Sequence, residues 1–149
     1  MPTHRVYLVR HGKAEPRSDD DAARRLTREG RDRFSRLLLA LGDRLPVSRV
    51  LTSPLARARE TAEILAGSRR VPLELAAALA AGASSGQDIL AMAREASPDT
   101  ALVGHNPELA EAVALAAGEE LELKPGAVAA LQVRGSEVTL AWLERPPKP

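Results

Sequence analysis

The sequence predicts an α/β layer fold, because short apolar runs alternate with segments of helical periodicity along most of its 149 residues. The first apolar run, residues 5–10, is almost continuous, as expected for a strand covered on both faces. The last two runs, residues 127–133 and 138–143, are joined through Gly135 and Ser136, which favour a hairpin turn. We therefore expect a sheet that ends in an antiparallel hairpin.

Helices are predicted where apolar residues recur at helical spacing behind a capping residue. Thr27 is the expected N-cap of a helix that Pro46 ends. Ser53-Pro54 and Asn106-Pro107 each combine an N-cap with a first-turn proline, and a further helix is expected after residues 76–86. The strands between these helices are predicted at residues 49–52, 71–75 and 100–103. Because neither a repeat nor a linker interrupts the pattern, residues 1–149 are predicted to form one domain.

Composition excludes several classes of function. Without cysteine there can be no disulfide, thiolate metal site or cysteine nucleophile, and three histidines are too few for a histidine-rich metal centre. Three aromatic residues argue against a stacking platform for nucleic acid. No signal-peptide pattern is present, and no apolar run approaches the roughly 20 residues of a membrane span. We expect a cytoplasmic protein with no metal, cofactor, membrane or nucleic acid.

The charge is distributed unevenly, although the net charge is only +1. Residues 1–70 hold 16 Lys and Arg against 9 Asp and Glu, whereas the remainder of the chain is acidic. A basic half is typical of proteins that bind nucleic acid or an anionic substrate. However, the four arginines between residues 28 and 36 alternate with Glu29 and Asp32, as on a solvated helix face. The charge alone therefore does not define a partner.

Unusual polar residues follow three of the predicted strands. Arg10 and His11 come at the end of the first strand, Ser53 at the end of the second, and His105 after the fourth. In doubly wound sheets, ligands bind beyond the carboxyl ends of the strands. Two of the three histidines therefore fall where a ligand site is expected, which is the strongest functional signal in the sequence.

Four segments resemble motifs of the histidine phosphatase (phosphoglycerate mutase-like) superfamily, in the same order over nearly the whole chain. They are Arg10-His11-Gly12, residues 26–30, residues 53–62 and residues 104–107. The resemblance implies a phosphoglycerate mutase-like three-layer α/β/α sandwich with a mostly parallel central sheet. It also implies that His11 is the nucleophile, that Arg57 is a phosphate arginine, and that catalysis needs no metal.

The chemistry of these residues agrees with the resemblance. A neutral imidazole of His11 can attack phosphorus and leave again, so that hydrolysis proceeds through a covalent phosphohistidine. Arg10 and Arg57 are permanently charged and planar, which suits phosphate oxygens. His105, if protonated, would be a third donor. Together with Gly12 and Asn106, these residues form the predicted phosphate site.

The substrate is suggested by a missing carboxylate. Superfamily phosphatases and mutases generally carry an acid after the third strand, but residues 75–86 contain no Asp or Glu. An alkoxide leaving group needs a proton, whereas imidazole, with a pKa of about 6.5, leaves readily. The short connection between the third and fourth strands also leaves little room for a lid. Both features resemble small bacterial phosphohistidine phosphatases of the SixA type, so phosphohistidine on a protein is the expected substrate.

Two alternatives remain open from the sequence. One is a general phosphomonoesterase acting on a small phosphorylated metabolite, with Glu15, four residues after His11, as a candidate acid. The other is a module that binds a phosphoanion or nucleic acid without turnover, which is less favoured because binding does not require a nucleophile. The sequence does not define the physiological substrate or the oligomeric state.

Overall fold

The fold is a six-stranded sheet between two layers of helices, as described by a computed structural model for residues 2–17 and 19–148. The strands lie in the order β3-β2-β4-β1-β5-β6. They are β1 (Thr3–Arg10), β2 (Arg49–Thr52), β3 (Leu73–Leu75), β4 (Thr100–Gly104), β5 (Val128–Arg134) and β6 (Glu137–Glu144). Strands β1 to β4 form only parallel pairs with one another, whereas β5 pairs antiparallel with β1 on one side and with β6 on the other. The predicted α/β class and the hairpin are confirmed.

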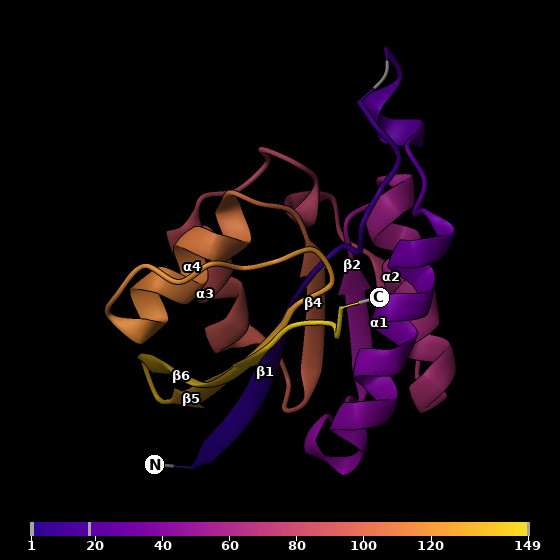
Figure 1. The fold of residues 1–149 in the computed structure, drawn as a ribbon. Coiled ribbons are helices and arrows are strands. Elements are labelled where there is room, and N and C mark those ends of the chain that lie inside the picture. Colours follow the sequence, from indigo (N-terminus) through magenta and orange to yellow (C-terminus); the bar gives the residue numbers. More distant parts are fainter. Residues whose placement is uncertain (1, 18, 149) are drawn as a thin grey trace.

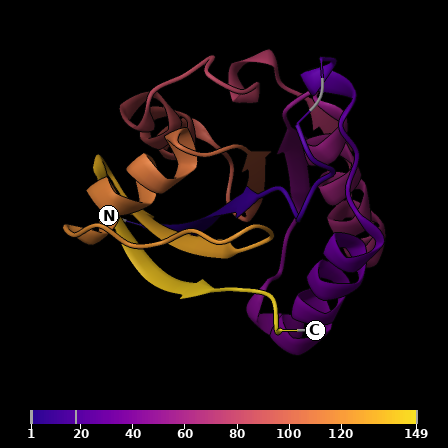
Figure 2. The ribbon, with the colours of Figure 1, turned by 45° about the horizontal axis from the view of Figure 1, so that its top comes forward.

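The helices cover the sheet in pairs (Figures 1 and 2). They are α1 (Arg28–Leu41), α2 (Ala56–Arg69), α3 (Gly86–Glu95) and α4 (Glu108–Ala117). Tyr7 and Val9 of β1 pack against α1 and α2, whereas Val6 and Leu8 pack against α3 and α4. Because side chains alternate along a strand, a strand buried on both faces is apolar throughout. Among the described residues, no helix is both long and apolar enough to cross a membrane.

Two helices begin later than their proline pairs predict. Helix α2 begins at Ala56 with Leu55 at its N-cap, because the Ser53 hydroxyl instead accepts a hydrogen bond from the Leu55 amide in a local turn. Helix α4 begins at Glu108, which leaves Pro107 at the N-cap. Thr27 caps α1 as predicted, and its hydroxyl accepts from the Gly30 amide at 2.9 Å.

The functional edge of the sheet is set by the pairing of β1, β4 and β2. Arg10 is level with Gly104 across β1 and β4, and Thr52 is level with Val103 across β2 and β4. The residues that follow these three parallel strands therefore emerge at one edge. The loop between β1 and α1, with its 3-10 turn η1 (Asp21–Ala23), extends beyond this edge at the top of Figure 1.

Gly30 is required where α1 lies against the chain that leaves β1. A Cβ atom at Gly30 would lie 2.3 Å from the Lys13 carbonyl oxygen, which already accepts a hydrogen bond from Thr27. We expect Gly30→Ala to lower the free energy of unfolding by about 1–3 kcal/mol, the usual cost of overpacking. The measurement is urea denaturation of the purified protein.

Gly67→Ala in α2 is the matched control for this substitution. A Cβ atom at Gly67 would meet no described atom within 4 Å, and Ala is the better helix former. The control should therefore raise the free energy of unfolding by up to about 1 kcal/mol. Equal shifts of the same sign in the two variants would contradict the steric explanation.

Candidate active site

A cavity of about 360 Å³ lies at the edge of the sheet where β1, β2 and β4 end. Its lining residues are Arg10, His11, Arg17, Asp21, Arg24, Arg57, Ala81, His105 and Asn106. The structure thus brings together five of the six residues predicted from the sequence. It adds three charged residues from the loop after β1 that the sequence motifs do not identify.

His11 is held as a neutral ring with one basic nitrogen. Its Nδ1 atom lies 2.7 Å from the Gly12 carbonyl oxygen, and because a carbonyl can only accept, we assign the proton to Nδ1 and a lone pair to Nε2. Burial lowers the pKa of His11 to about 3, and the charges of Arg10 and Arg57 act in the same direction. At pH 7 the ring therefore carries no charge.

Gly12 positions His11 and does not line the cavity, which corrects its predicted role in phosphate binding. The Gly12 amide donates to the Thr61 hydroxyl at 3.0 Å, and its carbonyl accepts from His11. Thr61 in turn donates to the Arg57 carbonyl oxygen at 2.8 Å. Both polar groups of Gly12 are therefore used within the protein. Thr61 lies within the matching segment 53–62, but spacing alone does not show that it joins α2 to the residue after His11.

Arg10 and Asn106 are oriented by the same backbone atom. The Leu123 carbonyl oxygen accepts from Arg10 Nη1 at 3.0 Å and from Asn106 Nδ2 at 3.1 Å. Burial lowers the pKa of Arg10, whose ordinary value of 12.5 is so high that the guanidinium keeps its charge at neutral pH. The contribution of Leu123 was not predictable, because it comes from a backbone atom in a segment without a recognisable motif.

His105 lies beside His11 as a second neutral imidazole. The two ring centroids are 5.2 Å apart, and His105 Nε2 is 2.7 Å from the Ser53 hydroxyl. Burial, together with the charge of Arg57, lowers the pKa of His105 to about 4. The protonated His105 considered above is therefore not present at pH 7. Ser53, predicted as a helix cap, contacts this histidine instead.

Arg57 is almost fully buried, and it binds the loop after β1. Its two terminal nitrogens donate to the carbonyl oxygen of Asp21 at 2.8 Å and to the Asp21 carboxylate at 3.1 Å. The same carboxylate accepts from Arg24 at 2.9 Å. Asp21 is therefore a carboxylate held between two arginines of the cavity wall. Arg59, two residues further along α2, is exposed and is not among the cavity residues.

Glu15 lies away from the cavity, contrary to the expectation that it reaches the rim as an acid. Its carboxylate accepts a hydrogen bond from the Arg25 amide at 2.9 Å, across the bridge that pairs Ala14 with Leu26. Its side chain is therefore used to hold the two arms of the loop together.

Glu60 of α2 anchors the same loop from the other side. Its buried carboxylate accepts from the Leu26 amide at 2.9 Å, from Arg25 at 2.8 Å and from Arg31 at 2.6 Å. These donors outweigh the effect of burial and hold the pKa of Glu60 below its ordinary value. The loop that carries Asp21 is thus attached to α2 by charged contacts.

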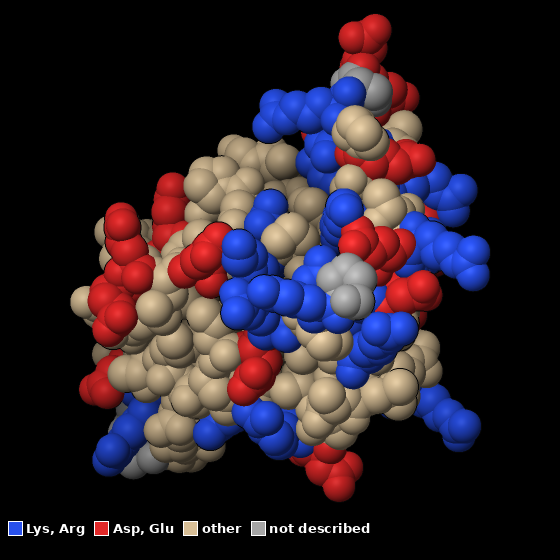
Figure 3. All heavy atoms as spheres, viewed as in Figure 1, with Lys and Arg blue, Asp and Glu red and all other residues tan. Residues whose placement is uncertain are grey.

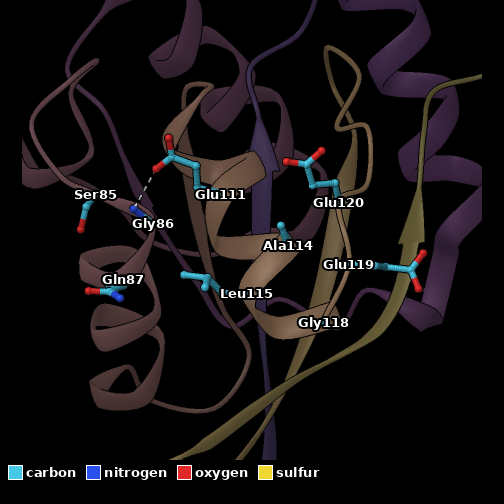
Figure 4. Close-up of a pocket in the computed structure, with 9 residues that line it drawn as sticks. All are labelled: Ser85, Gly86, Gln87, Glu111, Ala114, Leu115, Gly118, Glu119 and Glu120. Atoms are coloured by element: carbon cyan, nitrogen blue, oxygen red, sulfur yellow. Dashed lines mark hydrogen bonds between the residues drawn. The ribbon is translucent and has the colours of Figure 1, made fainter.

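A second hollow, of about 670 Å³, lies between α3 and α4 (Figure 4). Its carboxylates are Glu111, Glu119 and Glu120, and its lining residues include no Lys or Arg. Figure 3 shows carboxylates gathered on the side of α3 and α4, with many of the basic groups nearer the centre of the view. A phosphate dianion would be repelled by this hollow, so the smaller cavity is the candidate site.

Comparisons with known proteins find a matching family and a related sequence. The model of the histidine phosphatase superfamily (branch 1) matches residues 6–122. An uncharacterised protein of Picosynechococcus is 40% identical over 140 residues, which cover 85% of this chain and 84% of that protein.

Two solved structures share the fold. The chain is similar to a putative phosphohistidine phosphatase SixA from Agrobacterium tumefaciens, with a TM-score of 0.82, 23% identity and coverage of 97% and 99% of the two chains. It is also similar to the protein histidine phosphatase SixA complexed with tungstate, with a TM-score of 0.79, 24% identity and coverage of 95% and 97%. At these identities the similarity establishes the fold.

Proposed function

Because this chain belongs to the histidine phosphatase superfamily, we propose that it hydrolyses phosphohistidine on proteins through a covalent phosphohistidine on His11. The observation that carries the proposal is the state of His11. A buried ring with its proton fixed at Nδ1 offers a lone pair at Nε2, in a cavity that also contains Arg10 and Arg57. That combination suits attack on a phosphoryl group.

The first step transfers the phosphoryl group to His11. Nε2 of His11 forms a bond to phosphorus while the P–N bond of the substrate breaks, and the electron pair of that bond goes to the departing imidazole nitrogen. A substrate imidazole that carries a proton on its other nitrogen then leaves as a neutral ring. No proton has to move during this step, so no general acid is required.

The second step regenerates the enzyme. A water oxygen attacks phosphorus, the P–N bond to His11 breaks, and its electron pair returns to Nε2. The products are neutral His11 and dihydrogen phosphate, which balances atoms and charge without an added base. The Gly12 carbonyl holds the Nδ1 proton in both steps, so the same tautomer is restored.

Arg10 and Arg57 are proposed to stabilise the phosphoryl group during both transfers. In such transfers the charge is spread over three oxygens, and fixed positive groups supply most of the stabilisation. Arg10 is already oriented by Leu123 and Arg57 by Asp21, so neither has to be ordered when substrate binds. Asn106 and neutral His105 complete the polar wall of the cavity.

The proposed substrate class follows from the carboxylates near the site. Asp21 is the one carboxylate among the cavity residues that the structure describes, and it is bound to Arg24 and Arg57. Such contacts stabilise the ionised form, so Asp21 is a poor proton donor for an alkoxide. A phosphoramidate does not need that donor.

The test compares kcat/KM on a phosphohistidine-bearing protein with kcat/KM on glycerol phosphate. We expect a preference of at least about 10²-fold for the phosphoprotein, given the difference in leaving groups. Because phosphohistidine also hydrolyses without enzyme, a His11→Gln sample supplies the background rate. A preference for glycerol phosphate would instead support the small-molecule phosphomonoesterase.

A further inference from the structure

We propose that Asp21 contacts the leaving group and selects phosphoramidate substrates, with its carboxylate accepting a hydrogen bond from the N–H of the departing imidazole. This inference rests on the proposed function and specifies how the site distinguishes its substrate. The superfamily motifs quoted above leave Asp21 out, since it lies between the first two of them in sequence.

The first support is the position of Asp21. It belongs to η1, outside the sheet, yet it lines the same cavity as His11 and Arg57. Two contacts to Arg57 and one to Arg24 fix its backbone and its carboxylate. The Asp21 side chain is still 52% exposed, so one side of the carboxylate remains open to a ligand.

The second support is the number of donors that Arg57 has available. A guanidinium carries five N–H groups. Asp21 uses one on each terminal nitrogen of Arg57, which leaves the other donors for phosphoryl oxygens. A phosphoryl group bound to the same guanidinium would therefore lie beside the Asp21 carboxylate, and the proposal places the departing side of the substrate at that carboxylate.

The third support is the ionisation of Asp21. Its hydrogen bond to Arg24, together with Arg57, holds the pKa of Asp21 below its ordinary value. An ionised carboxylate cannot protonate an alkoxide, but it accepts an N–H and favours the protonated form of a neighbouring imidazole. As the bond from phosphorus to His11 Nε2 forms, the substrate P–N bond breaks, and the proton on the other nitrogen remains with the leaving ring.

The experiment compares Asp21→Asn with wild type on two small probes, N-phosphoimidazole and p-nitrophenyl phosphate. In the form that is protonated on the second ring nitrogen, only the first has an N–H on its leaving group. We expect Asp21→Asn to lower kcat/KM for N-phosphoimidazole by about 10- to 100-fold, the value of a hydrogen bond to a charged group. With p-nitrophenyl phosphate, and for inhibition by inorganic phosphate, the loss should be about tenfold smaller, because Arg57 keeps its hydrogen bond to the backbone carbonyl oxygen of residue 21 when the carboxylate is replaced.

Asp19→Asn is the matched control. The substitution removes the same charge from the same loop, and Asp19 is not among the cavity residues. It should leave both probes unaffected. An equal loss on both probes in Asp21→Asn, with weaker phosphate inhibition, would show that Asp21 only positions Arg57. A gain in kcat/KM on both probes, with stronger inhibition by phosphate, would show that the Asp21 carboxylate competes with phosphate for Arg57. Either result overturns the inference.

The outcome remains distinguishable from failure of the proposed function. If the wild-type enzyme prefers glycerol phosphate to the phosphoprotein, the proposed substrate is wrong. The ratio of the two Asp21→Asn effects still decides whether this carboxylate contacts an N–H-bearing leaving group. If the phosphoprotein is preferred but the two probes respond equally, the function stands and the inference about Asp21 is wrong.

Discussion

His11→Gln should lower kcat by at least about 10⁴-fold, because it removes the nitrogen that we propose attacks phosphorus. Gln has no comparable lone pair, so the reaction would be left to water and to the arginines. The measurement is steady-state hydrolysis of p-nitrophenyl phosphate, whose leaving group needs little assistance. Rapid quenching in base with radiolabelled substrate should also trap a base-stable, acid-labile phosphoryl group on wild type alone.

His4→Gln is the matched control for this substitution. His4 lies on β1, the same strand that leads to His11, but it is not among the cavity residues. It should leave kcat close to the wild-type value and should retain the trapped phosphoryl group. Full activity in His11→Gln, or an unchanged yield of trapped phosphoryl group, would remove the basis of the proposed mechanism.

Arg57→Lys should lower kcat/KM by roughly 10²- to 10³-fold, the range seen when one preorganised donor to a developing charge is removed. The substitution keeps the positive charge but loses the planar fork, so one ammonium would have to serve both Asp21 and the phosphoryl group. Inhibition by inorganic phosphate should weaken in parallel. Both quantities can be obtained from one series of p-nitrophenyl phosphate assays.

Arg59→Lys controls for the general effect of replacing Arg by Lys in α2. Arg59 is exposed and lies two residues along the same helix. We expect its kinetic constants to match wild type within about twofold, as for an exposed side chain with no substrate contact. If Arg57→Lys behaved like Arg59→Lys, the phosphoryl group would have to be held elsewhere.

Much of the fold was predictable because it depends on local patterns. The apolar run of β1 and the cap at Thr27 each act over a few residues, and the structure confirms both. The convergence of His11 and His105 was also predictable, since parallel strands bring their carboxyl ends to one edge. These inferences required no knowledge of how the loops fold.

The loop contacts were not predictable, because they join residues that are far apart in the sequence. Asp21 meets Arg57 across 36 residues, and Arg10 meets the Leu123 carbonyl across 113 residues. Such pairs depend on the path of irregular segments, for which periodicity gives no register. Glu15 shows the corresponding error, because closeness to His11 in sequence did not place its carboxylate near the cavity.

The hydroxyl of Thr61 has a thermodynamic consequence for catalysis. It accepts from the Gly12 amide at 3.0 Å and donates to the Arg57 carbonyl at 2.8 Å, so two hydrogen bonds connect the residue after His11, the proposed nucleophile, to the helix that carries Arg57. The entropy of aligning these two groups is therefore lost when the chain folds, before any substrate arrives. Binding then has to order only the substrate itself, which leaves more of its interaction energy to lower the barrier.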